Sequence, residues 1–137
     1  MVKQLPKFVM IKPIFKKWEF ITNLSTDILY FKGLYDDHEG FRVLLETESD
    51  NKLLKVSFDT VLSYRNTDES DLIKLFDESE GIGGGCVYTV SKSNFLKSFH
   101  DNNHGIRQDE VITHFAIYTP SACLDILSIS NPDIMWV

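Results

Sequence analysis

The stretch Val111-Ile112-Thr113-His114-Phe115-Ala116-Ile117-Tyr118-Thr119 is the strongest strand signal in the chain. Apolar residues occupy both the odd and the even positions, so both faces of the strand are expected to be buried. A strand that is buried on both faces lies in the middle of a sheet. The stretch therefore predicts a central strand, around which the rest of the fold is arranged.

The residues after this strand predict a short helix and a closing strand. Thr119 can cap a helix, and Pro120 fits the first helical position, where no N–H donor is needed. We expect this helix to run from Pro120 to Leu127. Asn131-Pro132 then interrupts the chain, and residues 134–137 are expected to form the last strand.

The first two thirds of the chain contain further strand signals and two polar turns. Alternating or aromatic-rich runs predict strands, and the polar segments 36–40 and 49–51 are short and turn-prone, as hairpin loops require. The predicted strands are residues 29–35, 41–46, 54–58, 61–66 and 86–90.

Three segments predict helices before the central strand. Residues 13–24 place Pro13 at a possible helix start, and residues 67–77 begin with Thr67 as a cap followed by acidic residues. Ser93 is expected to cap a third helix, which stops near Gly105. The sum is about seven strands and three or four short helices. We therefore expect one α+β domain over residues 1–137, with an antiparallel or mixed sheet.

Charge is distributed unevenly along the chain. Residues 36–80 hold thirteen acidic against five basic side chains, a net charge of −8, whereas residues 1–35 carry +4. An acidic segment disfavours binding to nucleic acid phosphates and attracts a basic partner. The expected partner-binding residues are nine of these thirteen acids and two tyrosines that flank the acidic stretches, namely Tyr35, Asp36, Asp37, Glu39, Tyr64, Asp68, Glu69, Asp71, Asp77, Glu78 and Glu80.

The remaining composition indicates a cytoplasmic protein. Cys86 and Cys123 are too few for the disulfide framework of a small secreted domain, and are expected to be buried thiols. Lysines interrupt every apolar run of the N-terminal segment before it reaches signal-peptide length. No run approaches the length that spans a bilayer.

An alternative hypothesis is a small metal- or ligand-binding domain, or an enzyme. His100 and His104 are four residues apart and could share a helix face for a metal, and Cys86 with His114 could form a nucleophile and base. The helix is expected to break near Gly105, and a buried histidine is more often a core residue. No catalytic motif is evident, and no cofactor is expected.

The segment His114-Phe-Ala-Ile-Tyr-Thr-Pro-Ser-Ala-Cys-Leu-Asp-Ile-Leu-Ser resembles the closing strand and helix of small bacterial immunity proteins. These proteins neutralise toxins of contact-dependent growth inhibition systems. The resemblance implies a cytosolic inhibitor that binds one toxin domain, often a nuclease, and blocks its active site. It implies no fixed set of functional residues.

Overall fold

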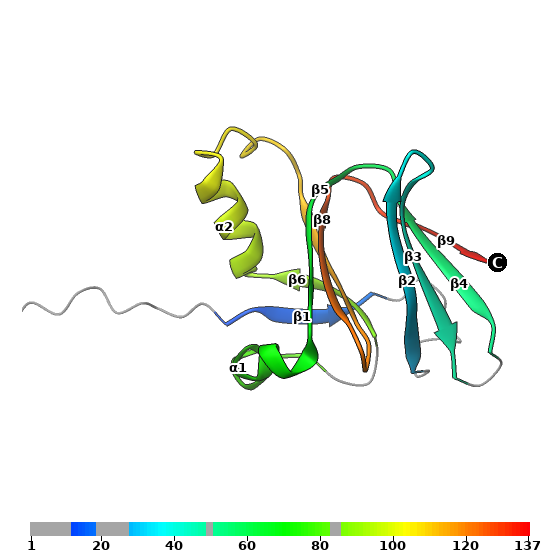
Figure 1. Cartoon of the computed structure of the whole chain (residues 1–137). Coiled ribbons are helices and arrows are strands. Elements are labelled where there is room, and N and C mark those ends of the chain that lie inside the picture. The colour runs from blue at the N-terminus through cyan, green and yellow to red at the C-terminus, as the bar shows by residue number, and fades with distance from the viewer. Residues whose placement is uncertain (1–11, 19–27, 49–50, 83–85) are drawn as a thin grey trace, which may run out of the picture.

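The strands form two antiparallel sheets in the computed structural model, which describes residues 12–18, 28–48, 51–82 and 86–137 (Figure 1). The first sheet has the strand order β1-β6-β7-β8-β5. Its members are β1 (Ile14–Lys17), β5 (Val61–Thr67), β6 (Val87–Ser91), β7 (Thr113–Tyr118) and β8 (Cys123–Ser128). The second sheet has the order β2-β3-β4-β9 and contains β2 (Leu29–Asp37), β3 (Gly40–Thr47), β4 (Leu53–Phe58) and β9 (Asp133–Trp136).

The two sheets pack face to face and enclose the main core. Val43, Leu54 and Val56 from the second sheet belong to the same buried cluster as Phe115 and Ile126 from the first. Each of these side chains is 0–1% exposed. Apolar burial is the main driving force for such packing, and it explains why alternate residues of β3 and β4 are apolar.

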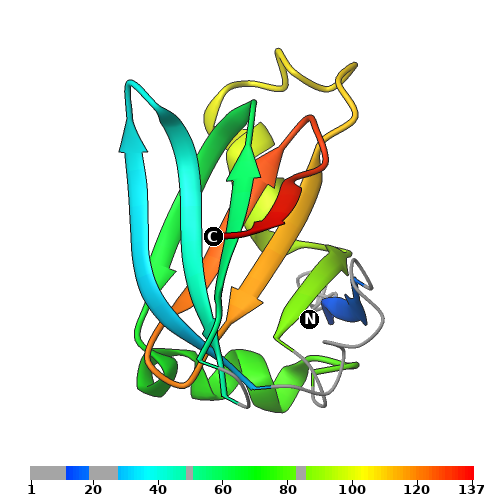
Figure 2. The same cartoon turned by 90° about the vertical axis from the view of Figure 1, so that its right-hand side faces the viewer.

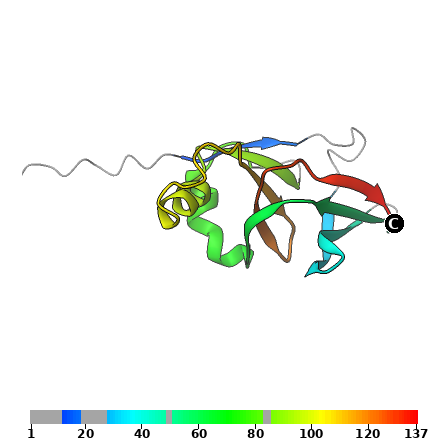
Figure 3. The ribbon, with the colours of Figure 1, turned by 90° about the horizontal axis from the view of Figure 1, so that it is seen from above.

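Two helices lie on the other face of the first sheet, so the molecule has three layers (Figures 1 and 3). A short 3-10 helix η2 (Glu69–Leu72) leads into α1 (Ile73–Glu78), and α2 (Asn94–Asn102) follows β6. Strand β7 is buried on both faces because Phe115 and Ile117 face the second sheet, whereas Ala116 packs with Phe15 and Tyr88 in a smaller cluster on the helix side. The expectation of a central strand at residues 111–119 is thus confirmed.

Several other expectations are confirmed. The hairpin of β2 and β3 turns at residues 38–39, and Asp37 pairs with Gly40 across it. Strands β4, β5, β6 and β9 lie where strands were predicted. Ser93 caps α2, because its hydroxyl oxygen accepts a hydrogen bond from the Leu96 amide at 2.9 Å. The broad expectation of a sheet-rich fold with short helices therefore holds.

The number of elements was wrong, because the described residues form nine strands in two sheets and only two α-helices with one 3-10 turn. The predicted helix from Pro120 to Leu127 is strand β8. Thr119 and Ala122 close a tight turn through both backbone and hydroxyl bonds of 2.8–3.0 Å. Proline suits the second position of a turn as well as the start of a helix, and burial on both faces decides in favour of the strand.

Two further corrections concern the other helices. Residues 14–17 of the predicted helix 13–24 form β1, which pairs with β6 and buries Phe15, and residues 19–24 lie outside the described residues. Thr67 ends β5 and caps no helix. Asp68 instead accepts bonds from the Ser70 amide and hydroxyl at 2.9 and 2.7 Å. Within the described ranges, no helix is long and apolar enough to cross a membrane.

Candidate functional site

The acidic residues predicted to bind a partner fall into two separate regions. The β2–β3 turn, which carries Asp36, Asp37 and Glu39, lies at one end of the molecule, whereas η2 and α1 lie at the other (Figures 1 and 2). Figures 1 and 2 both show the β2–β3 turn and α1 at opposite ends of the strands. The structure therefore does not bring residues 36–39 and 68–80 into one surface.

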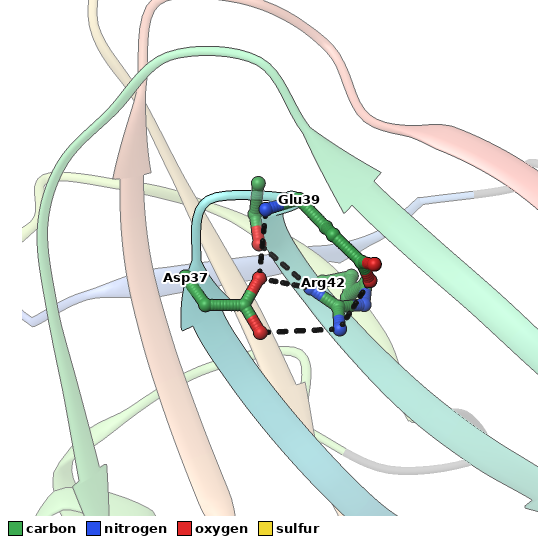
Figure 4. A network of polar contacts seen from close by, with 4 residues as sticks. Asp37, Glu39 and Arg42 are labelled. Atoms are coloured by element: carbon green, nitrogen blue, oxygen red, sulfur yellow. Dashed lines mark hydrogen bonds and ion pairs between the residues drawn. The ribbon is translucent and has the colours of Figure 1, made fainter.

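The acidic turn is partly neutralised by an arginine. Arg42 on β3 donates to the Asp37 carboxylate at 2.8 Å and to Glu39 at 3.2 Å (Figure 4). The hydrogen bond from Arg42, with that from the Glu39 amide, holds the pKa of Asp37 below its ordinary value. The Arg42 guanidinium also lies 4.8 Å from the centre of the Tyr35 ring. Tyr35 and these charges thus form one exposed but internally paired cluster.

The opposite end contains an open hollow between acidic and apolar groups. Its lining consists of Asp68, Glu69, Ser70, Phe76 and Pro120, and its volume is about 390 Å³. The bonds from Ser70 lower the pKa of Asp68, so this carboxylate stays ionised. Phe76 rests on Tyr118, with ring centres 5.9 Å apart. The hollow thus combines the carboxylates of Asp68 and Glu69 with the Phe76 ring, which packs against Tyr118.

The other acids of this region extend the negative surface. Asp71 and Asp77 are exposed, and Glu80 joins the chain to β1 through backbone bonds to Pro13 and Phe15. The side chain of Glu78 lies outside the described part of the structure. Among the described side chains, no ion pair engages an acid of this region, in contrast to the Arg42 cluster. The Tyr64 ring packs on Phe41 of β3, with ring centres 4.8 Å apart, and Phe41 pairs with Asp36 across the β2–β3 hairpin.

The histidines and cysteines of the alternative hypothesis are dispersed. Cys86 faces the main core, where burial raises the pKa of its thiol to about 12. His100 lies in the last turn of α2, whereas His104 lies beyond the helix with a left-handed φ of 57°. Among the described residues, no group of three or more His, Cys, Asp or Glu side chains could hold a metal ion.

A buried polar cluster between the first sheet and α2 was not anticipated. His114 on β7 is hydrogen-bonded through Nδ1 to the Ser93 hydroxyl and through Nε2 to Asp125 on β8, both at 2.6 Å. Tyr118 donates to the same Asp125 oxygen at 2.8 Å, and Arg65 on β5 donates to the other oxygen at 2.9 Å. His114 and Asp125 are 4% and 0% exposed. The expectation of a satisfied core histidine is thereby confirmed.

The charges of this cluster balance one another. Burial alone would raise the pKa of Asp125, but the hydrogen bonds from His114 and Arg65, together with the positive charge of Arg65, outweigh burial and hold this pKa below its ordinary value. Burial and the neighbouring Asp125 carboxylate raise the pKa of Tyr118, which stays protonated and donates. The Arg65 guanidinium also lies 4.4 Å from the centre of the Phe95 ring, which links β5 to α2.

The sequence contains one signal for this cluster. Asp125 is the single charged residue between Ala122 and Ser128, a run that is otherwise apolar or small. A lone carboxylate in such a run needs a buried partner, but the assignment of the run to a helix concealed that need. Comparison with known proteins adds no further assignment, because no protein family, curated protein or solved structure matches the chain.

Proposed function

We propose that the protein inhibits a basic partner protein by binding it, without catalysing a reaction on that partner, through the end of the molecule formed by η2, α1 and the β7–β8 turn. The observation that supports this proposal is the open hollow in which Asp68 and Glu69 stand beside Phe76 and Pro120. In this proposal the partner is a toxin domain with a basic active site, such as a nuclease, and the chain acts as its immunity protein.

The hollow suits a cationic side chain of the partner. An arginine or lysine that enters it would meet two carboxylates, and charge-assisted hydrogen bonds of this kind are stronger than neutral ones. The Phe76 ring offers an apolar wall for the stem or the plane of the cation. Aromatic residues beside charged ones are typical of the side chains that dominate the energetics of interfaces.

Long-range charge supports the same partner. The chain carries a net charge of −6, and Asp71 and Asp77 add exposed negative charge beside the hollow. A negative field speeds encounter with a positively charged protein and weakens as salt is added. Such a surface would cover the basic cleft in which a nuclease binds its phosphates.

The test neutralises the two carboxylates of the hollow without changing their size. The partner to assay is the protein encoded immediately upstream of the gene or, failing that, the protein that co-purifies with the chain from its native cell. We expect Asp68→Asn with Glu69→Gln to weaken binding at least 10-fold, mainly through faster dissociation, because direct charged hydrogen bonds are lost. Dissociation and association rates are measured by surface plasmon resonance at low and high salt.

The matched control makes the same change of charge at the opposite end. Asp36→Asn with Glu39→Gln also removes two negative charges, so it should reproduce any loss of long-range attraction but leave dissociation unchanged. Equal effects of the two double variants would refute a binding site at the hollow. Binding that is insensitive to salt and to both variants would refute the acidic mechanism altogether.

A further inference from the structure

We propose that Ser93 is an activated nucleophile, for which His114 is the base and Asp125 the group that orients the base, and that it accepts acyl groups from small esters. The geometry that supports this is the continuous chain from the Ser93 hydroxyl through His114 Nδ1 and Nε2 to Asp125, with both links at 2.6 Å. Nothing in this inference depends on the proposed partner or on the hollow.

For the neutral form of His114, we assign one direction to each hydrogen bond. The Leu96 amide donates to Ser93 Oγ, so the hydroxyl proton is free to point at His114 Nδ1. A neutral imidazole that accepts at Nδ1 carries its proton on Nε2, where it donates to Asp125. Arg65 stabilises the ionised form of Asp125 at 2.9 Å. Hydroxyl, imidazole and carboxylate thus have the order of roles that serine nucleophiles require.

The two ring nitrogens of His114 exchange the roles that they have in the Ser-His-Asp triad of serine proteases, where Nε2 faces the serine and Nδ1 the carboxylate. Here the serine is bonded to Nδ1 and the carboxylate to Nε2. Either nitrogen of an imidazole can take up a proton when the other is protonated and anchored. The chemical requirement is therefore met by this arrangement. The exchange of the two nitrogens changes the direction from which the proposed substrate approaches the serine. In this proposal it approaches from the N-terminal end of α2.

That end also provides donors for a negatively charged oxygen. Ser93 already satisfies two of the first amides of α2, since its hydroxyl binds the Leu96 N–H and its carbonyl binds the Lys97 N–H. The N–H groups of Asn94 and Phe95 lie in the first turn of α2, where an α-helix offers them no intrahelical carbonyl. Amides at a helix N-terminus stabilise an oxyanion that forms beside them.

The local backbone presents the serine at a sharp turn between strand and helix. Strand β6 ends at Ser91, and Lys92 adopts a left-handed φ of 53° before Ser93 begins the helix. A non-glycine residue in this region is uncommon and marks a constrained turn. Ser93 is half-buried between the exposed residues Lys92 and Asn94. In this proposal a small ester approaches from this exposed side of the hydroxyl, since the imidazole behind it is shielded and His114 is 4% exposed.

The proposed step is an acyl transfer. Ser93 Oγ forms a bond to the ester carbonyl carbon while its proton passes to His114 Nδ1. The tetrahedral intermediate collapses as the bond from carbon to the alcohol oxygen breaks, and the alcohol leaves with the proton from His114. An acyl-serine remains, and water can hydrolyse it by the same proton transfers in reverse order.

The test uses the intact protein with two probes, p-nitrophenyl acetate and a fluorophosphonate. We expect a burst of about one equivalent of p-nitrophenolate and one fluorophosphonate adduct per chain, located on Ser93 by peptide mass spectrometry. His114→Gln should slow labelling about 100-fold or more, because general base catalysis contributes at least this factor. Absence of labelling in the folded wild-type protein would overturn the proposal.

A second variant separates reactivity from structure, because Ser93 also caps α2. Asparagine is an equally good cap, so Ser93→Asn should keep the wild-type circular dichroism spectrum and melting temperature yet lose the adduct completely. Ser91→Ala, which changes the neighbouring serine, should be labelled at the wild-type rate. An adduct that persists in Ser93→Asn, or one that is unaffected by His114→Gln, would mean that the reactive group lies elsewhere and that the three residues serve only to hold α2 on the sheet.

Discussion

Removing the carboxylate of Asp125 is the most informative perturbation of the fold. Its two oxygens accept hydrogen bonds from His114, Tyr118 and Arg65. These donors lie on β7 and β5, the two strands that flank β8 in the first sheet. Asp125→Ala would leave these three donors without their acceptor. Two of them are shielded from water, since His114 is buried and Tyr118 is half-buried.

The size of the effect follows from how many donors water can reach. A buried donor that loses its acceptor costs about 1–3 kcal/mol, so His114 and Tyr118 together predict a loss of about 2–6 kcal/mol in the free energy of unfolding. The Arg65 side chain is 43% exposed, and water replaces most of its lost bond. A domain of this size is typically stable by about 5–15 kcal/mol, so a loss near the middle of the predicted range of about 2–6 kcal/mol leaves the variant folded.

Urea unfolding at 25 °C, followed by circular dichroism, measures this loss. Asp133→Ala is the control, because Asp133 is exposed on the edge strand β9, and its change should stay within about 0.5 kcal/mol. A loss below about 1 kcal/mol for Asp125→Ala would refute the view that this carboxylate organises the layer between α2 and the sheet.

Acid should remove the same contribution. The pKa of folded Asp125 lies below its ordinary value of 3.8, so the stabilisation is fully present above that value and is lost as pH falls through the folded pKa. The difference in stability between wild type and Asp125→Asn should therefore be constant near neutral pH and shrink below about pH 4. A difference that grows on acidification would contradict the lowered pKa.

Two further predictions concern the glycines and the thiols. Gly81 and Gly40 both adopt left-handed φ angles, of 89° and 103°, but a Cβ on Gly81 would collide with the backbone carbonyl of Phe15 whereas one on Gly40 meets open space. Gly81→Ala should thus destabilise the protein by clearly more than the ~1 kcal/mol expected for Gly40→Ala, and equal urea midpoints would contradict this. Burial raises the pKa of Cys86 to about 12 and of Cys123 to about 11, so iodoacetamide at pH 8 should modify both only after unfolding; rapid modification of the native protein, seen by mass spectrometry, would refute the buried placement.

Local chemistry made much of this fold predictable from the sequence. The alternation of residues 41–46 and 54–58, with polar turns between them, specified the hairpins because side chains of a strand point alternately to opposite faces. The cap at Ser93 was equally local, since the hydroxyl and the Leu96 amide that it binds are three residues apart. Buried runs such as residues 113–118 needed only their own composition to identify a central strand.

Segments with two compatible structures were decided by their tertiary surroundings. Thr119-Pro120 suits both a helix start and a hairpin turn, and the pairing of β8 with β7 on one side and β5 on the other selects the turn. Residues 14–17 likewise become a strand because β6 offers an unpaired edge. No local pattern states how many sheets the strands will form, because that depends on which strands find each other across the core.

The candidate sites depend most strongly on tertiary structure. Composition alone established that residues 36–80 are acidic, but only the folded chain sends the 36–39 turn and the 68–80 segment to opposite ends and pairs Arg42 with the first of them. Arg65 and Asp125 are 60 residues apart in sequence and 2.9 Å apart in space. The physical reason is that hydrogen bonds and ion pairs act over a few ångströms, whereas the positions that they join are set by strand pairing and core packing over the whole chain.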